Sequence, residues 1–384
     1  MPQHCDVIII GGGIAGASLA YFLAGERQVV LLERESHVGY HTTGRSAAVY
    51  TPDHGAPLVR QLSHASYAML SDPPAGFTGQ PLLSRRGQLL IANQEGEERL
   101  RTYARNVAEQ GGRLTGIPLS DARKLLPILR EEALAAAFHD PDICDIDVDA
   151  LYQGFLRSAR SWGLKLVTDA DVVGIDPVGS SWRIRTSQGE WIAPVVVNAA
   201  GAWADAVAAM AGLPPLGVVP KRRTMVLVDP PPGHDIHSWP LTVDFATGFY
   251  MKPDAGRLLA SPIDATPSDP CDAQPEELDI AICIDRLQQM LDLPVRRVFK
   301  AWAGLRSFLP DEEPVAGFDS RAPGFFWLAG QGGFGIQTAP ALGAAAAAIL
   351  LGRDLPDYLL AHGISAERLG PDRLRSIRHE APAA

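Results

Sequence analysis

The segment that most constrains the fold is a glycine-rich turn at residues 11–16, with the sequence Gly-Gly-Gly-Ile-Ala-Gly. A short apolar run ends at Ile10, and apolar residues at helical spacing follow the turn, which predicts a strand, a tight turn and a helix. Gly11 permits the turn, Gly13 lets the backbone approach a pyrophosphate, and Gly16 allows the helix to pack closely. The segment therefore predicts a Rossmann-like unit that binds a dinucleotide.

Two further features bear on the ligand of that unit. Glu33, at the end of the second predicted strand, is placed to accept hydrogen bonds from ribose hydroxyls. Residues 331–335 form a second glycine-rich turn before an alanine-rich helix that we expect from about Pro340. A helix N-terminus there would favour an anion such as reduced flavin, and a purely structural turn explains the same residues equally well. The turns alone leave FAD and NAD both open, because both cofactors use them.

The composition is that of an ordinary folded protein, with 46% hydrophobic and 20% charged residues, and a length of 384 residues favours two domains. The formal net charge of −10 argues against a nucleic-acid partner, since the one compact basic run, residues 221–223, is too short. The apolar runs near residues 7 and 344 fit neither a signal peptide nor a membrane span, and the four cysteines are scattered. We therefore expect a cytoplasmic protein without disulfides or zinc.

The aspartates at residues 145–149 have the alternate spacing of a calcium-binding loop. Ala150 stands where such a loop needs glycine for its sharp turn, and Leu156 stands where a bidentate glutamate should close the site. We expect no metal site, and we interpret Asp149 as the N-cap of a helix that runs through Trp162.

The order of the predicted elements indicates an α/β (α+β) protein with two interleaved domains. A Rossmann-like domain is expected to comprise residues 1–83, 146–215 and 325–384, because strand and helix patterns return after Phe325. A substrate domain built on a mixed or antiparallel sheet is expected to comprise residues 84–145 and 216–324, where strand-like runs alternate with proline-rich loops.

Four motifs together resemble the D-amino-acid oxidase family of flavoproteins. They are the N-terminal glycine turn, residues 41–48 (His-Thr-Thr-Gly-Arg-Ser-Ala-Ala), residues 197–203 (Val-Asn-Ala-Ala-Gly-Ala-Trp) and the C-terminal glycine turn. The resemblance covers nearly the whole chain. Within the family, residues 39–50, 145–151, 221–223, 249–256 and 302–308 are most similar to the D-arginine dehydrogenases.

The resemblance implies noncovalent FAD. Glu33 and Arg34 would lie near the adenosine, the backbone of Val172 beside the adenine, Thr43, Arg45, Ser46 and Ala47 along the pyrophosphate and flavin, and Gly335 and Gln337 near the flavin ring. The remaining cofactor residues implied are Gly11, Gly13, Ile14, Ala15, Gly16, Ala48, Ala200, Gly201, Trp203, Gly333, Phe334 and Ile336. No cysteine lies near Gly335, so a thioether link to the flavin is not expected.

The substrate expected from this resemblance is a free amino acid, whose carboxylate a guanidinium holds best. Arg306 is the leading candidate because its apolar surroundings, residues 302–308, would leave an unpaired cation in need of a ligand. Taken without the resemblance, a salt bridge from Arg306 to Asp311 or Glu312 explains it equally well. The resemblance implies that Arg223 and Tyr250 complete the carboxylate site, with Gln337 as a further catalytic residue.

The implied reaction is hydride transfer from Cα to FAD, followed by hydrolysis of the imine to a 2-oxo acid and ammonia. Backbone carbonyls near Thr51 and Gly333 would orient the amine, so no strong side-chain base is needed. The resemblance favours a dehydrogenase, with a quinone or oxygen as the final acceptor. Glycine or sarcosine oxidase-like chemistry, oxidation of a 2-hydroxy acid, and a binding protein with structural FAD remain alternatives.

Three pocket positions depart from the D-arginine pattern: Gln88 replaces an acidic residue, His54 replaces a lid tyrosine and Val49 replaces a histidine. A neutral amide compensates a buried cation less well than a carboxylate does. We therefore expect a weaker preference for D-Arg and D-Lys and relatively better turnover of neutral D-amino acids.

Overall fold

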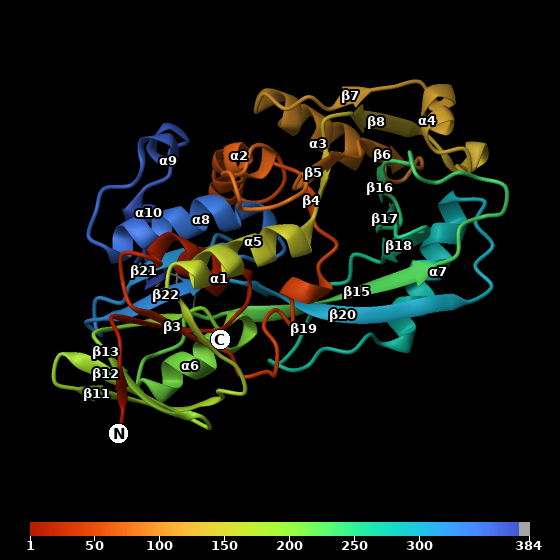
Figure 1. Cartoon of the computed structure of the whole chain (residues 1–384). Coiled ribbons are helices and arrows are strands. Elements are labelled where there is room, and N and C mark those ends of the chain that lie inside the picture. The colour runs from red at the N-terminus through yellow and green to blue at the C-terminus, as the bar shows by residue number, and fades with distance from the viewer. Residues whose placement is uncertain (376–384) are drawn as a thin grey trace.

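The computed structural model describes residues 1–375, and its first layer is a six-stranded sheet in the order β10-β3-β2-β14-β22-β21 (Figure 1). All neighbouring pairs are parallel except β21 with β22. The strands are β2 (Val7–Ile10), β3 (Val29–Leu32), β10 (Lys165–Val167), β14 (Val195–Asn198), β21 (Val315–Phe318) and β22 (Phe325–Ala329). Every residue of β2, β3 and β22 is buried, as expected for parallel strands covered on both faces.

The two faces of this sheet carry separate hydrophobic cores. Val7 and Ile9 point into a core shared with α1, α2 and α8, whereas Ile8 and Ile10 point into a core shared with α6 and a small sheet in the order β1-β13-β12-β11. Figure 1 shows these two layers above and below the sheet. The elements are α1 (Ile14–Leu23), α2 (Pro57–Ser71), α5 (Val148–Ser161), α6 (Ala204–Met210), α8 (Gly335–Leu350), α9 (Asp357–Ala361), α10 (Ala366–Leu369), β1 (Gln3–His4), β11 (Val172–Val178), β12 (Ser181–Thr186) and β13 (Gly189–Ala193).

A second, mixed sheet follows the order β19-β15-β18-β17-β16-β6-β8-β7, with β20 paired to β15. Its β16–β6 pair is parallel and its other pairs are antiparallel. The elements are β6 (Gln88–Ala92), β7 (Thr115–Gly116), β8 (Ala136–Asp140), β15 (Val219–Val228), β16 (Leu241–Asp244), β17 (Phe249–Asp254), β18 (Arg257–Ser261), β19 (Thr266–Pro267), β20 (Val298–Phe308), α3 (Glu97–Glu109), α4 (Leu119–Leu125) and α7 (Glu277–Met290). The long β15–β20 ribbon runs from this sheet toward the first one (Figure 1).

A three-stranded sheet, β4 (Val49–Tyr50), β9 (Cys144–Ile146) and β5 (Leu83–Arg85), lies where the chain passes between the two larger sheets. Short 3-10 turns complete the fold: η1 (Thr43–Arg45), η2 (Glu131–Ala133) and η3 (Gly201–Trp203). The α/β fold with a Rossmann-like layer and a mixed-sheet layer is as the sequence predicts.

Local details differ from the expectations. Strand β21 belongs to the first sheet, so a division by sheets would move the expected boundary at residue 325 to before Val315. Helix α5 is capped by Asp147, whose carboxylate accepts the N–H of Ala150 at 2.8 Å, and not by Asp149. Helix α8 begins at Gly335, earlier than Pro340, so the proline lies inside the helix and donates no bond to the preceding turn. Ser66 Oγ accepts the next N–H, from Ala341.

Candidate active site

A single cavity of about 1050 Å³ is lined from both large sheets and from the loops between them. It gathers residues that lie far apart in the sequence, from Gly11 to Gln337. Of the candidate residues named from the sequence, all except Gly16 line this cavity. They are Gly11, Gly13, Ile14, Ala15, Glu33, Arg34, Thr43, Arg45, Ser46, Ala47, Ala48, Val49, Thr51, His54, Gln88, Val172, Ala200, Gly201, Trp203, Arg223, Tyr250, Arg306, Gly333, Phe334, Gly335, Ile336 and Gln337.

The three glycines of the first turn have different neighbours. Gly11 has φ of +109°, and a Cβ there would overlap the carbonyl oxygen of Ala199. A Cβ at Gly16 would overlap the carbonyl oxygen of Gly11, so Gly16 shapes the turn from behind the cavity wall. At Gly13 a Cβ would meet only Thr43 Oγ1, at 3.4 Å. The backbone at Gly13 is therefore open to close approach by a ligand in the cavity.

Hydrogen bonds fix this end of the cavity. Glu33 is 8% exposed, and its two carboxylate oxygens accept the N–H groups of Gly12 at 2.9 Å and Glu35 at 3.0 Å. Each oxygen can accept a further bond. Thr43 Oγ1 accepts the N–H of Ile14 at 3.0 Å and so joins the loop at residues 39–48 to the start of α1.

An aromatic surface lines the same end. The Trp203 ring lies 4.7 Å from the His41 ring. The Arg34 guanidinium lies 5.1 Å from the centroid of the Trp203 ring. With the open backbone at Gly13 and the fixed carboxylate of Glu33, this region has the donors, the acid and the flat wall that an adenine dinucleotide requires. The residues present therefore fit the FAD that the resemblance implies.

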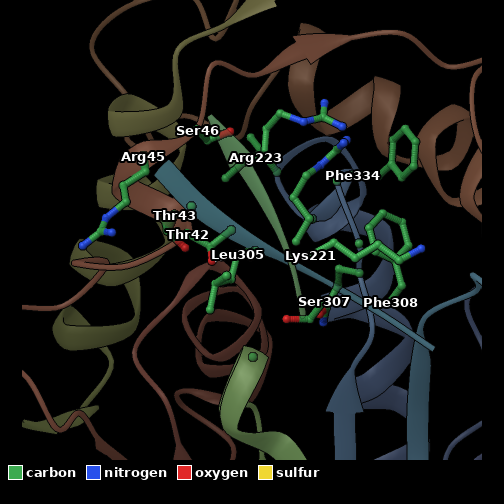
Figure 2. Close-up of a pocket in the computed structure, with 18 of the residues that line it drawn as sticks. Thr42, Thr43, Arg45, Ser46, Lys221, Arg223, Leu305, Ser307, Phe308 and Phe334 are labelled. Atoms are coloured by element: carbon green, nitrogen blue, oxygen red, sulfur yellow. Dashed lines mark hydrogen bonds between the residues drawn. The ribbon is translucent and has the colours of Figure 1, made fainter. Parts of the chain in front are cut away.

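Arg45 lines the cavity, and its guanidinium bonds protein groups on distant segments of the chain. Its Nη1 donates to the carbonyl oxygens of Ala273 at 2.9 Å and Ala303 at 3.0 Å, and its Nη2 bonds the carboxylate of Asp272. Figure 2 shows this side chain pointing away from the part of the cavity where Arg223 and Phe308 lie. Arg45 fastens the cofactor loop to β20, the strand that carries Arg306.

Arg306 has no carboxylate partner within residues 1–375. Asp311 pairs with Arg373 at 2.8 Å and Glu312 lies 3.8 Å from Lys221, so the alternative interpretation of Arg306 as a salt-bridge residue is wrong. A Cβ at Gly333 would overlap its guanidinium, so this cation lies directly against the second glycine turn. Burial and the nearby charge of Arg223 lower the pKa of Arg306 to about 10, which leaves it protonated at neutral pH. A desolvated, unpaired guanidinium of this kind is suited to bind an anion.

Arg223 lies two residues beyond Lys221, which is directly opposite Arg306 in the β15–β20 ribbon, so the three cations share one face. The Arg223 Nε donates to the carbonyl oxygen of Asp264 at 2.7 Å. Asp264, which sequence reasoning missed, is itself held by the N–H and hydroxyl of Thr224 at 2.7 and 3.0 Å. Its loop begins beyond β18, where no spacing rule could place it beside Arg223.

Tyr250 extends from β17 into the cavity wall. Its hydroxyl donates to the thioether sulfur of Met225 at 3.2 Å. Sulfur is a weak acceptor, so a carboxylate oxygen of a ligand would compete for this donor.

Gln337 is 2% exposed and its amide is already bonded to protein. Its Oε1 accepts the N–H of Thr51 at 3.0 Å and its Nε2 donates to Ser63 Oγ at 2.8 Å. The side chain thus ties the loop at residues 51–56 to α8. This arrangement supports a positioning role in place of the expected catalytic one.

Replacing Gln337 with Met is expected to lower the free energy of unfolding by about 1–3 kcal/mol, because the N–H of Thr51 loses its buried acceptor. We expect the KM for substrate to rise more than kcat falls, since the loop at residues 51–56 lines the cavity. Denaturant titration and steady-state kinetics measure both effects. Unchanged stability together with a loss confined to kcat would instead favour a direct catalytic role.

His54 lies between two rings, at 5.6 Å from Phe334 and 6.1 Å from Tyr103, and its Nδ1 is 3.3 Å from the Tyr103 hydroxyl. Desolvation deep in the cavity and the charge of Arg306 lower the pKa of His54 to about 4, so its imidazole is neutral at physiological pH. Phe245, 5.1 Å from Tyr103, extends this row of rings. Tyr103 and Phe245 were missed because each comes from a segment without a recognisable motif.

Residues 1–375 contain neither a membrane-spanning helix nor a metal-binding cluster. No helix there is long and apolar enough to cross a bilayer. No cluster of three or more His, Cys, Asp or Glu side chains there could hold a metal ion.

Comparison with known proteins places this geometry among flavoenzymes. Glycine oxidase from Geobacillus kaustophilus is 27% identical over 89% of this chain and 92% of its own, and its crystal structure superposes with a TM-score of 0.81 at 25% identity, covering 92% of this chain and 96% of that one. The structure of iminodiacetate oxidase from Chelativorans sp. BNC1 has a TM-score of 0.77 at 25% identity, covering 95% of this chain and 99% of that one. The bovine (Bos taurus) FAD-dependent oxidoreductase domain-containing protein 1 is 25% identical over 91% of this chain and 82% of its own.

The family comparison agrees with these relatives and with the dinucleotide-binding wall of the cavity. The model of the DAO family, described as FAD dependent oxidoreductase, matches residues 6–349. FAD is the cofactor of that family. Since the match spans well over half of the sequence, the chain belongs to the DAO family of FAD-dependent oxidoreductases.

Proposed function

We propose that the protein oxidises the carbon–nitrogen bond of a free amino acid, in the manner of a glycine oxidase. The observation that carries the proposal is Arg306, a desolvated guanidinium without a carboxylate partner in residues 1–375, which lines the same cavity as the cofactor turn. The similarity to glycine oxidase, 27% identical, and to iminodiacetate oxidase supports an amine that also bears a carboxylate.

The chain's residues would act as follows. Arg306 binds the substrate carboxylate, and Arg223 and the Tyr250 hydroxyl add donors to it. This anchoring fixes Cα and restricts its rotation, which is how positioning lowers the barrier of such a reaction. Noncovalent FAD, when bound, supplies the acceptor for the hydride from Cα. None of the four cysteines lines the cavity, so none is available to attach FAD covalently.

Proton transfer needs no strong base from the protein. His54, whose pKa is lowered to about 4, is a poor base at neutral pH. The substrate therefore has to bind, or become, the neutral amine, whose lone pair assists departure of the hydride. The carbonyl groups of Thr51 and Gly333 are the acceptors proposed to orient that amine, and water completes the reaction by hydrolysing the imine.

A second candidate is oxidative deamination of D-amino acids that carry a side chain. The cavity is also lined by Gln88, Leu241, Val243 and Phe245, which a substrate side chain could contact and which glycine has no side chain to reach. Val49 and His54 line the same region. A dehydrogenase that passes electrons to a quinone, or an oxidase that uses oxygen, fits this candidate equally.

Anaerobic stopped-flow reduction tests the function. Glycine, sarcosine, D- and L-alanine, D-methionine and D-lactate are mixed with the FAD-loaded protein while flavin absorbance is recorded. We expect amines that carry a carboxylate to bleach the flavin and lactate to leave it oxidised. Bleaching by lactate alone, or by none of these compounds, would contradict the proposal. Faster reduction by D-alanine and D-methionine than by glycine and sarcosine would favour the second candidate.

A further inference from the structure

A small recess of about 20 Å³ adjoins the substrate end of the main cavity. The two share Thr51, His54, Gln88 and Tyr103 as wall residues. The recess is lined further by Asp53, Val107, Leu114, Asp140 and Ile143. Its volume suits one group of the size of a water molecule.

Asp140 is the buried acid of this recess. It lies at the end of β8, directly across the strand pair from Gln88 on β6, and is 9% exposed. Its Oδ1 accepts the N–H of Asp142 at 2.9 Å. Within residues 1–375 no cation forms a salt bridge with it, whereas Asp53 has His64 at 2.9 Å. A buried carboxylate without a salt-bridge partner is stabilised when a ligand brings a cation to it.

The recess and the carboxylate site have opposite charge. Lys221, Arg223 and Arg306 share a face of the β15–β20 ribbon and line the main cavity. Asp140 lines the recess, where burial together with the charges of Asp142 and Asp53 raises its pKa. His54 lines both the main cavity and the recess, and its Nδ1 lies 3.3 Å from the hydroxyl of Tyr103, which also lines both. A substrate with an acid at one end and a cation at the other complements this polarity.

We propose that Asp140 is a specificity-determining residue that binds a primary ammonium at the far end of the substrate's side chain. This inference rests on the proposed function, because it requires that Arg306 hold the carboxylate. A recess for one water-sized group accepts an ammonium and is too small for a planar guanidinium. The carboxylate missing at position 88 is thus supplied from the neighbouring strand, and amino acids such as lysine and ornithine are preferred over both arginine and apolar isosteres.

Lysine and norleucine make a matched pair, because they differ only in the terminal ammonium. The kcat/KM of each is measured with the enantiomer that reduces the flavin, for the FAD-loaded wild type and for Asp140→Asn. We expect the wild type to prefer lysine over norleucine by at least tenfold, with arginine below lysine. In Asp140→Asn that preference should fall by at least tenfold, with norleucine turnover within about twofold of the wild type.

Asp121→Asn is the control, since its partly exposed carboxylate on α4 pairs with Lys124 at 2.7 Å, and it should leave the preference unchanged. If Asp140→Asn does not fold, Gln88→Lys places a competing cation across the strand from Asp140 and should lower lysine turnover more than norleucine turnover. Equal use of lysine and norleucine by the wild type, or an equal loss of both in Asp140→Asn, overturns the proposal. If neither compound nor any simpler amino acid bleaches the flavin, the proposed function itself fails.

Discussion

Arg306→Met is expected to lower kcat/KM for every amino acid substrate by about 30- to 4000-fold. The estimate follows from the cost of about 2–5 kcal/mol for removing one partner of a buried, hydrogen-bonded charge pair, at 1.4 kcal/mol for each tenfold. FAD content should change little, because the groups that fit the dinucleotide, the Gly13 backbone, Glu33 and Trp203, remain in place. Flavin reduction under single-turnover conditions measures the loss.

The stability of the same variant separates a ligand site from a structural ion pair. Within residues 1–375 Arg306 has no salt-bridge partner to lose, and its pKa is lowered by burial, so Met at this position should leave the free energy of unfolding unchanged or raise it. Arg185→Met, which removes an exposed arginine 3.0 Å from Asp176, should keep normal kinetics. A large drop in the melting temperature of Arg306→Met would show that the cation serves the fold.

Gly13→Val is expected to give a folded protein that fails to retain FAD. Gly13 has φ of −75° and ψ of −177°, which any residue adopts, and a Cβ would meet only Thr43 Oγ1 at 3.4 Å. The added methyl groups would therefore enter the cavity where the cofactor backbone must approach. Overpacking of about 1–3 kcal/mol weakens binding by at least about 5- to 150-fold. Circular dichroism and flavin content of the purified protein measure the two effects.

Gly11→Ala and Gly79→Val are the two comparison variants for Gly13→Val. Gly11 has a positive φ and no space for a Cβ, so its substitution should impair folding as well as binding. Gly79 has no atom within 4 Å of an added Cβ, so valine there should leave both unchanged. A yellow, fully loaded Gly13→Val protein would mean that the cofactor does not approach this turn.

Much of the fold could be predicted from sequence because its signals are local. The turn at residues 11–16 carries its own strand and helix, and the later elements follow from hydrophobic period and from proline and glycine. A prediction failed where two neighbouring residues suit the same position almost equally well. Asp147 and Asp149 are both good N-caps, and only the path of the chain from β9 decides between them.

The site was less accessible to sequence reasoning, because what a side chain bonds depends on segments far away in the chain. The guanidinium of Arg45 is consumed by carbonyl groups more than 220 residues distant, at Ala273 and Ala303. Asp140, which faces Gln88 across the strand pair, was overlooked for the same reason, since it becomes visible only through the register of β6 with β8. The family resemblance identified the residues that line the cavity. Their bonding partners depend on strand pairing, which the sequence does not reveal.

The proposed function requires that Arg306 hold the substrate's carboxylate beside the flavin. Binding of an amine-free carboxylate such as propionate, followed by the change in flavin absorbance, tests it without turnover. We expect a saturable spectral change in the wild type, competition with amino acid substrates, and a dissociation constant at least about 30-fold weaker in Arg306→Met. Equal affinity in the two proteins would show that another group holds the acid.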